Sequence, residues 1–392
     1  MTGRAQMRAA ASAVLLAMGL AGWPTAASPL NATLLLRADD SRLDRSRVER
    51  AYLGHPGGPA ADGLRLALED GGFELDAAQA AVKTRTEQVA SADAARRAAQ
   101  AAAQAGAAVL LTDLPADWTL AVADAVALPV LDVGTADDRL RAQDCRARLY
   151  HLLPSERMRS DALAQYLLTR KWTQLLLLTG SSAVDAERAA TVQASLTRYG
   201  LKVVASKPFK LSADPRERNL ANPLLLTAGA SYDAVWVVDS DGEFARGLPY
   251  RIALARPVVG DAGLVPLAWH AQFERFGAPQ VSRRFAKAFG RPMTDHDWAA
   301  WLAGKALVAA AIAAPAGPAA KQAQALASAK LDGSKGTPLT FRAWDGQLRQ
   351  TVLLTDGQGV IAQAPVDGLL HPRDVLDTLG ADAPEKLCKV SR

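Results

Sequence analysis

Short polar loops at the ends of apolar runs carry the residues best suited to holding a ligand. They combine glycine with small hydroxyl or carboxylate side chains, and the candidate ligand-binding residues are Asp113, Thr135, Ser181, Ser182, Asp239 and Asp261. Backbone N–H groups at helix starts, with a few polar side chains, are what a cleft needs to orient a small molecule. The same residue types also cap the helices that follow. Both interpretations stay open for each residue.

Four aspartates could instead converge on a cation, because hard metal ions take oxygen ligands. They are Asp113, Asp137, Asp239 and Asp261. Helix capping is the simpler account of each. We therefore assign no metal-ligating residues. Three tryptophans, Trp118, Trp236 and Trp269, could line a pocket for an apolar body, but large aromatic residues more often anchor a core.

Motifs of known catalytic or cofactor chemistry are missing from the sequence. The five histidines are scattered, without metal-ligand spacing, and there is no nucleophile elbow, phosphate loop or dinucleotide fingerprint. The quartet from Thr294 to Asp297 resembles part of a catalytic triad, but no nucleophile lies near it, and Thr and Asp favour helix caps. We expect a protein that is not an enzyme, with no catalytic residues and no cofactor.

The first 27 residues have the pattern of a secretory signal peptide. Arg4 and Arg8 precede an apolar stretch that is shorter than the roughly 20 residues needed to span a bilayer, and small residues follow up to Ala27. We predict export, cleavage near Ala27 and a periplasmic location. No later stretch is long and uncharged enough for a membrane span, so no direct membrane insertion is expected.

The cysteines and the distribution of charge indicate the compartment of the protein and limit the kinds of partner that we expect. The two cysteines, Cys145 and Cys388, permit one disulfide in an oxidising compartment, or they remain free buried thiols. The sequence leaves that choice open, since it does not give the Cα separation. The 45 basic and 40 acidic residues are interspersed, whereas a nucleic-acid binder shows a concentrated basic stripe. No nucleic-acid partner is expected.

The elements that must position the loops alternate between short apolar strands and amphipathic helices. A strand is predicted at 30–36, a helix at 60–70 and a second strand at 73–81, while the charged stretch 39–50 is interpreted as a solvated insertion. Such alternation predicts an α/β fold of parallel sheets flanked by helices, with ligands bound beyond the carboxyl ends of the strands. Near the C-terminus, an Asp-Gly pair between 337–344 and 347–354 predicts a β-hairpin.

Several segments resemble a known family. The segment 57–70 (GGPAADGLRLALED) resembles the first-helix signature of type I periplasmic binding proteins of the branched-chain amino acid group, and 150–155 (YHLLPS) resembles their first crossover. Three further segments are similar to the ABC-transporter binding proteins associated with pyrroloquinoline-quinone (PQQ)-dependent alcohol dehydrogenase systems. They are 137–146 (DDRLRAQDCR), 297–301 (DWAAW) and 339–350 (LTFRAWDGQLRQ).

The resemblance implies two lobes, each a doubly wound parallel sheet flanked by helices, joined by a three-crossover hinge. Lobe one takes 28–150 and 263–335, and lobe two takes 151–262 and 336–392. It implies a monomeric, periplasmic solute-binding component of an ABC importer, which captures a small molecule between the lobes and docks on an inner-membrane permease. The loop 112–115 departs from the Ser-rich loop of the amino-acid binders, so the ligand class stays open among alcohols, organic acids, amino acids and metal ions.

We expect the two lobes to close on the ligand about the hinge, with the ligand shifting an existing open–closed equilibrium. Two alternatives share the fold. The protein could be a ligand sensor read by a separate kinase, or an accessory protein of the dehydrogenase without a transport role, and fold does not separate these functions.

Overall fold

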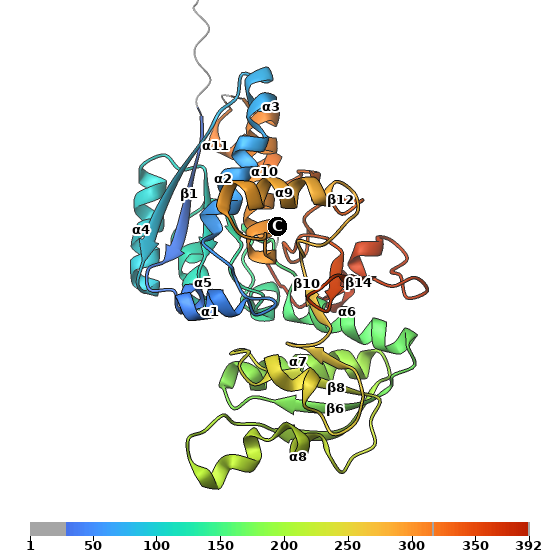
Figure 1. The fold of residues 1–392 in the computed structure, drawn as a ribbon. Helices are drawn as coiled ribbons and strands as arrows, with labels where there is room; N and C mark the ends of the chain where they lie inside the picture. Colours follow the sequence, from blue (N-terminus) through green and yellow to red (C-terminus); the bar gives the residue numbers. More distant parts are fainter. Residues whose placement is uncertain (1–28, 316, 391–392) are drawn as a thin grey trace, which may run out of the picture.

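The computed structural model describes residues 29–315 and 317–390, and it forms two parallel sheets, each covered by helices (Figure 1). The predicted signal peptide, residues 1–27, lies outside the described residues. The first sheet has the order β2-β1-β3-β4-β5, with all neighbouring strands parallel. Its strands are β1 (Leu30–Arg37), β2 (Val82–Val89), β3 (Val109–Asp113), β4 (Val130–Asp132) and β5 (Leu149–His151).

Helices cover both faces of this sheet, and together they make the first body. In β1, Leu34 packs into the core under α2 and α10, whereas Leu35 packs into the core under α4 and α5. This division follows from the strand geometry, in which successive side chains point to opposite faces. The helices of the first body are α1 (Arg45–Arg50), α2 (Ala60–Asp70), α3 (Gly72–Ala77), α4 (Ala92–Gln104), α5 (Ala116–Ala125), α9 (Ala278–Phe289), α10 (Asp295–Ala313) and α11 (Ala319–Ala327).

Two glycines allow α2 and α10 to pack backbone against backbone. A Cβ atom at Gly63 would collide with the carbonyl group of Asp297, and a Cβ atom at Gly304 would collide with the side chain of Ala67. Glycine has no Cβ, so the two helices approach closely at these points. This contact fixes the start of α10 relative to the first sheet.

The second body holds a four-stranded parallel sheet in the order β7-β6-β8-β9. Its helices and strands are α6 (Glu156–Thr169), β6 (Gln174–Thr179), α7 (Ala183–Arg198), β7 (Lys202–Pro208), α8 (Pro223–Thr227), β8 (Ala234–Val238) and β9 (Val258–Gly260). All residues of β8 are buried, because one hydrophobic core lies on each face of the sheet. The predicted α/β fold class with two parallel-sheet lobes is confirmed.

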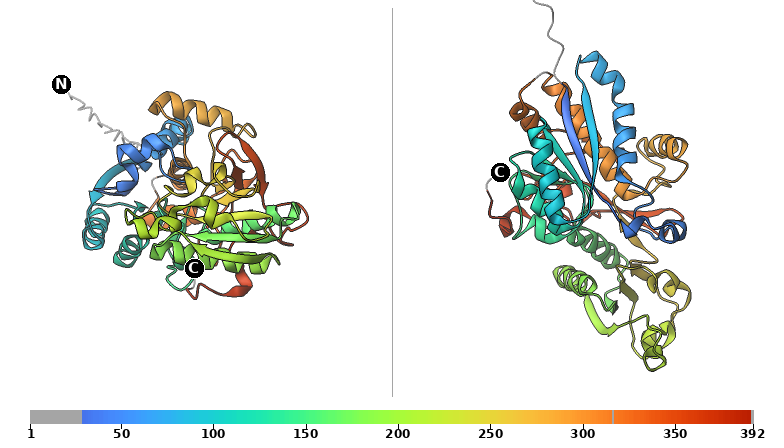
Figure 2. Two further views of the ribbon diagram at one scale, coloured as in Figure 1. Left: turned by 60° about the horizontal axis from the view of Figure 1, so that its bottom comes forward. Right: turned by 90° about the vertical axis from the view of Figure 1, so that its left-hand side faces the viewer.

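A small antiparallel sheet lies between the two bodies, and the C-terminal segment (red) runs through this layer (Figure 2). In β13, Leu353 packs into the first body, while Val352 and Leu354 pack into the second. The chain passes between the bodies after β5, after β9 and before β13; the residue limits of the lobes stay a prediction. The remaining strands are β10 (Val265–Leu267), β11 (Leu331–Asp332), β12 (Pro338–Leu339), β13 (Val352–Thr355) and β14 (Val360–Ala364).

The strand predicted at 73–81 is wrong. Residues 72–77 form α3, with Phe73 85% exposed, and the strand is β2 at Val82–Val89. Because β2 lies at the edge of its sheet and is mostly exposed, its sequence is polar. A search for apolar runs therefore passes over it.

Two further expectations hold only in part. The stretch 39–50 has no buried residue, as expected of a solvated segment, but it forms a 3-10 turn (Ser41–Leu43) and α1, and its arginines form ion pairs with both bodies. The predicted turn at Asp345–Gly346 exists, but only a single bridge, from Phe341 to Leu348, flanks it. The strand β13 pairs instead with β10 and β14.

Candidate functional site

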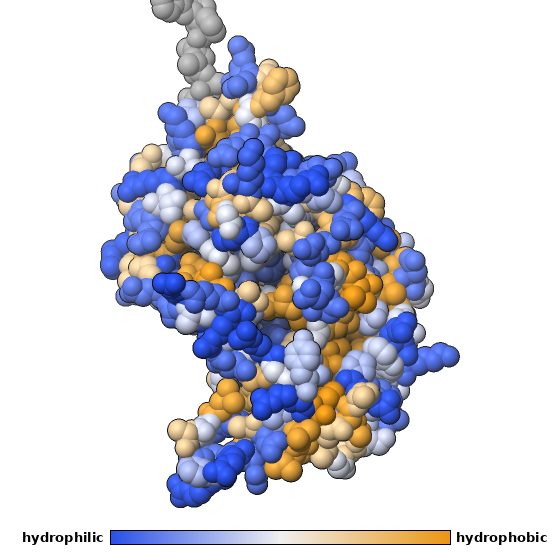
Figure 3. All heavy atoms as spheres, in the orientation of Figure 1, coloured by the Kyte–Doolittle hydropathy of each residue, from blue (hydrophilic) through white to orange (hydrophobic). Residues whose placement is uncertain are grey.

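A cavity of about 360 Å³ lies where the two bodies meet, and we call it the cleft. The surface is recessed at this level (Figure 3). The loop after β4 and the ends of β8 and β9 all contribute to its wall, as do the first turns of α6 and α7. Its volume lies in the range of small-molecule sites. The carboxyl ends of parallel strands from both bodies therefore meet at one cavity.

Three of the six predicted ligand-binding residues line the cleft. Thr135 comes from the first body, and Asp239 and Asp261 come from the second. Asp239 and Asp261 directly follow β8 and β9, and Thr135 is the third residue after β4, so all three lie beyond the carboxyl end of a buried strand, as the rule for parallel sheets requires.

The other three lie outside the cleft wall. Asp113 is buried at the end of β3 and accepts a hydrogen bond from Nη2 of Arg42 at 2.7 Å. Ser182 caps α7, its hydroxyl accepting from the N–H of Asp185, and Ser181 beside it is exposed. For Ser182 the capping interpretation accounts for the observed contacts.

Arg188 on α7 neutralises two carboxylates in the wall of the cleft. Its Nη1 and Nη2 lie 2.9 and 2.7 Å from the two carboxylate oxygens of Asp261, and its Nε lies 3.1 Å from Glu156. Burial alone would raise the pKa of Glu156, but the guanidinium groups of Arg188 and Arg159 hold that pKa below its ordinary value. Glu156 is thus ionised at neutral pH, and both acids are bound to Arg188.

Asp239 lines the cleft, and its side chain also stabilises the turn that follows β8. Its carboxylate accepts from the N–H of Ala245 at 2.8 Å, and its own N–H donates to Asp261 at 2.6 Å. Burial raises the pKa of Asp239 above its ordinary value. The two aspartates therefore shape the loop ends of β8 and β9 together.

Arg159, on the first turn of α6, offers the cleft an unused donor. Its Nε donates to the carbonyl of Pro154 at 3.4 Å and its Nη2 to Asp295 at 3.1 Å. Its Nη1 group has no acceptor among the described residues. Burial would raise the pKa of Asp295, but His296 and Arg159 lower it far more, so this carboxylate stays ionised. Arg159 is thereby held at the wall with a free N–H edge.

Two histidines complete the wall. Burial and the nearby charge of Arg47 lower the pKa of His55 to about 4, so this imidazole is neutral at neutral pH. His296 lies in the first turn of α10. Its neighbours Thr294 and Asp297 form a capping box, which confirms the helix-cap interpretation of the quartet.

Sequence reasoning missed five charged residues and one histidine of the cleft wall. They are Arg42, Arg47, His55, Glu156, Arg159 and Arg188. Four come from first turns of helices or from the stretch 39–50, which also lie at the carboxyl edge of a parallel sheet. Attention to first turns and to that stretch, besides the strand-end loops, could have found these four residues.

Metal binding finds no support in this arrangement. Within residues 29–315 and 317–390, no group of three His, Cys, Asp or Glu side chains could hold an ion. Of the four aspartates considered for a cation, Asp113, Asp137 and Asp261 are bound by arginines, and Asp239 caps a turn. In the described part of the chain, no helix combines the length and apolar character needed to cross a bilayer.

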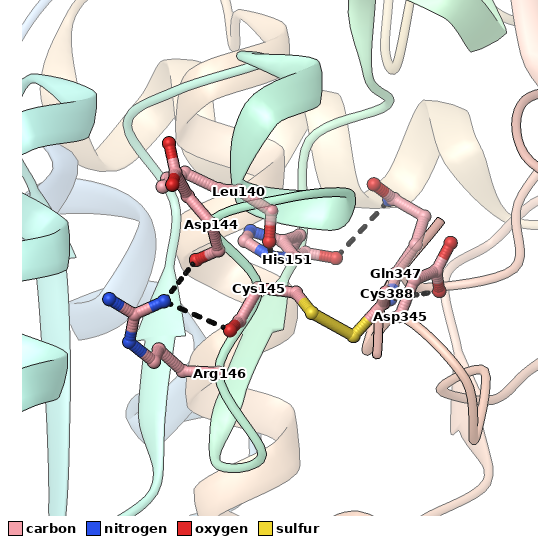
Figure 4. The surroundings of a disulfide bond; sticks show 8 residues. All are labelled: Leu140, Asp144, Cys145, Arg146, His151, Asp345, Gln347 and Cys388. Atoms are coloured by element: carbon pink, nitrogen blue, oxygen red, sulfur yellow. Dashed lines mark hydrogen bonds between the residues drawn. A yellow bond between two sulfur atoms is a disulfide. The ribbon is translucent and has the colours of Figure 1, made fainter. Parts of the chain in front are cut away.

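The two cysteines form a disulfide between the segment after β4 and the C-terminal tail (Figure 4). The Cα atoms of Cys145 and Cys388 lie 5.7 Å apart, within the range that a disulfide needs. An ion pair from Arg157 to Glu385, at 2.8 Å, holds the same tail against α6. The tail is thus fastened to both bodies.

Comparison with known proteins adds the fold family. No family model matches the sequence, and no curated protein matches it. The structure is similar to an ABC transporter substrate-binding protein from Sphaerobacter thermophilus, with a TM-score of 0.68 and 16% identity over 86% of this chain and 98% of that one. The chain has the type I periplasmic binding protein fold.

Two other solved structures with this fold are described by a class of ligand or contain a bound ligand. A branched-chain amino acid ABC transporter periplasmic ligand-binding protein from Burkholderia xenovorans has a TM-score of 0.67 and 15% identity, over 85% of this chain and 95% of that one. A solute-binding protein from R. palustris in complex with benzoate has a TM-score of 0.62 and 16% identity, over 83% and 92%. At these identities the similarity establishes the fold alone.

Proposed function

We propose that the protein is the periplasmic solute-binding component of an ABC importer and catalyses no reaction. The observation that carries the proposal is the cleft itself, walled by strand ends and helix starts from both bodies. Proteins with this fold that bind solutes support it. The acidic residues in the cleft are paired with Arg188 or cap a turn.

The charge of the cleft favours a small organic anion as the solute. Four guanidinium groups and three carboxylates line it, namely Arg42, Arg47, Arg159, Arg188, Glu156, Asp239 and Asp261. The free N–H edge of Arg159 suits a carboxylate, because charge-assisted hydrogen bonds to guanidinium are strong and directional. The bound benzoate of the R. palustris protein agrees with this class.

Capture works by closure of lobe one (28–150 and 263–335) on lobe two (151–262 and 336–392) about the three chain passages. Arg159 belongs to α6, which packs in the second body, while its partner Asp295 belongs to α10 of the first. A carboxylate at Arg159 would therefore lie where the two bodies meet. A ligand that prefers the closed form shifts the equilibrium toward it.

A thermal-shift screen of the mature chain with carboxylates, alcohols, amino acids, calcium and lanthanide ions tests the proposal. A ligand present at 100 times its Kd adds about 2.7 kcal/mol of stability, which gives a clear rise in Tm. For a carboxylate that binds, Arg159→Met should weaken affinity about tenfold to a hundredfold, the value of one charged hydrogen bond. Arg65→Met, at an exposed position on α2, is the control.

We further propose that the protein acts in PQQ-dependent alcohol oxidation. In this role it would work as a monomer and dock on an inner-membrane permease. The support for this proposal is the sequence resemblance of 137–146, 297–301 and 339–350. An alcohol-derived carboxylic acid would satisfy both this link and the cleft chemistry. If no solute in the screen raises the Tm and the protein co-purifies with a dehydrogenase, the accessory role replaces the import role.

A further inference from the structure

The segment 45–55 of the first body reaches the second body on the side of the cleft away from the chain passages. It consists of α1 and the turn that follows it, and we call it the strap. In Figure 1, α1 lies to the left, whereas β10 and β14, which adjoin the passages, lie to the right. Arg47 and His55 of the strap line the cleft. The strap therefore forms part of the cleft wall opposite the hinge.

Both ends of the strap are fixed to the first body. Just before it, Nη2 of Arg42 donates to Asp113, at the end of β3, over 2.7 Å. Just after it, the chain enters α2, which packs closely against α10 at Gly63 and Gly304. The strap should therefore move with the first body when the lobes rotate.

The middle of the strap forms two ion pairs with the loop that follows β8 in the second body. Nη1 of Arg47 lies 2.6 Å from a carboxylate oxygen of Asp241, and its Nη2 donates to the carbonyl of Asp241 at 2.9 Å. Arg50 pairs with Glu243, two residues further along the same loop. These contacts join the two bodies across the cleft.

Tyr52 gives the strap a shape that fits the same loop. Its ring is buried, and the guanidinium of Arg246 from the second body lies 5.9 Å from the ring centroid, within the range of a cation–π contact. A Cβ atom at Gly242, which has a φ of +81°, would lie 3.3 Å from atoms of the ring. Glycine tolerates this backbone conformation and lets the loop approach the ring closely.

The exposure of the ion pairs makes the strap a weak and reversible contact. The side chains of Arg50 and Glu243 are 42% and 34% exposed, and that of Asp241 is more exposed still. Exposed pairs of this kind shift an equilibrium about twofold to threefold each, so the two together shift it about fivefold. Such a contact favours one lobe arrangement without locking it.

We propose that the strap stabilises the closed form of the solute-free protein and controls access to the cleft from the side opposite the hinge. The proposal rests on the lobe closure proposed above, but not on which solute binds. Opening the lobes separates Arg47 and Arg50 from their acidic partners and removes Arg47 from the cleft wall. Salt screens exposed charges, so ionic strength should shift the balance toward the open form.

Distances between two spin labels test the proposal in the solute-free mature chain. Labels at Asp39→Cys and Ser181→Cys occupy exposed positions at the facing edges of the two sheets, outside the strap. Cys145 and Cys388 are joined in the disulfide and take no label. We expect a short and a long distance, with a long-to-short ratio that rises about fivefold between low salt and ~1 M NaCl.

Variants separate the strap from general effects of charge. Arg47→Gln/Arg50→Gln should show the raised ratio already at low salt and lose the response to salt. Arg45→Gln removes the same charge from α1, but Arg45 pairs with Glu49 in its own helix, so this control should behave as wild type. The swap Arg47→Asp/Asp241→Arg should regain part of the closed population that Arg47→Asp loses.

Three results would overturn the proposal: an unchanged ratio in the double variant, a full salt response in that variant, or an equal change in the Arg45→Gln control. Two distances that ignore the strap variants would reject the strap and leave lobe closure standing. A single distance in every sample would reject the strap and also count against the closure on which the proposed function relies.

Discussion

Removing the disulfide should cost the protein much of its stability. Cys145 and Cys388 are separated by 243 residues, so their bond closes a very large loop in the unfolded chain. The loop-entropy relation gives ~5.5 kcal/mol for a loop of this length at 25 °C. Measured values usually fall below this limit, and we expect a loss of about 3–5 kcal/mol in the double variant Cys145→Ala/Cys388→Ala.

Urea unfolding followed by circular dichroism measures the loss. Wild-type protein in dithiothreitol should show the same lowered midpoint as the double variant, while dithiothreitol should leave the variant unchanged. The C-terminal tail keeps its ion pair from Arg157 to Glu385 without the disulfide, so the native fold persists. A loss below about 1 kcal/mol would refute the reasoning, because it would mean that the crosslink does not restrict the unfolded ensemble.

Three other predictions concern packing and charge. Gly63→Ala should destabilise the protein by about 1–3 kcal/mol in urea, because its Cβ meets the α10 backbone, whereas Gly72→Ala meets nothing and serves as control. Burial raises the pKa of Asp138 to about 6, so the folded state holds a proton that the unfolded chain releases. Stability should therefore fall by at most ~3 kcal/mol as the pH rises from 4 to 6, and Asp138→Asn should lack this part of the pH profile. The Arg47–Asp241 pair has a carboxylate that is 60% exposed, so a double-mutant cycle should give only about 0.5 kcal/mol at low salt and nothing at 1 M NaCl.

Local signals in the sequence were sufficient for most of the fold. The helix predicted at 60–70 matches α2, because glycines and a proline mark its start and two glycines mark its end. The buried strands were visible as apolar runs, and β1 contains the predicted strand 30–36. The edge strand β2 was missed because only a neighbouring strand, and not its own sequence, determines that it pairs.

The site was predictable only in part. The rule that ligands gather at the carboxyl ends of parallel strands found Thr135, Asp239 and Asp261. It could not find Arg159 or Arg188, since these lie on helices and their side chains reach the cleft only through ion pairs with residues distant in sequence. Such pairings depend on tertiary structure and leave no local pattern.

The first turn of α10 contributes to the helix cap, to an ion pair between the two bodies and to the walls of two cavities. Thr294 and Asp297 start the helix, Asp295 holds Arg159 and lines a second cavity of about 370 Å³ beside the cleft, and His296 lines the cleft. A substitution in this turn would alter helix initiation and both cavities together. Selection can therefore rarely change one cavity here without harming the other or the start of the helix. Diversification of ligand preference among descendants of this protein should therefore accumulate at the loop after β4 and at the end of β9, and leave this turn unaltered.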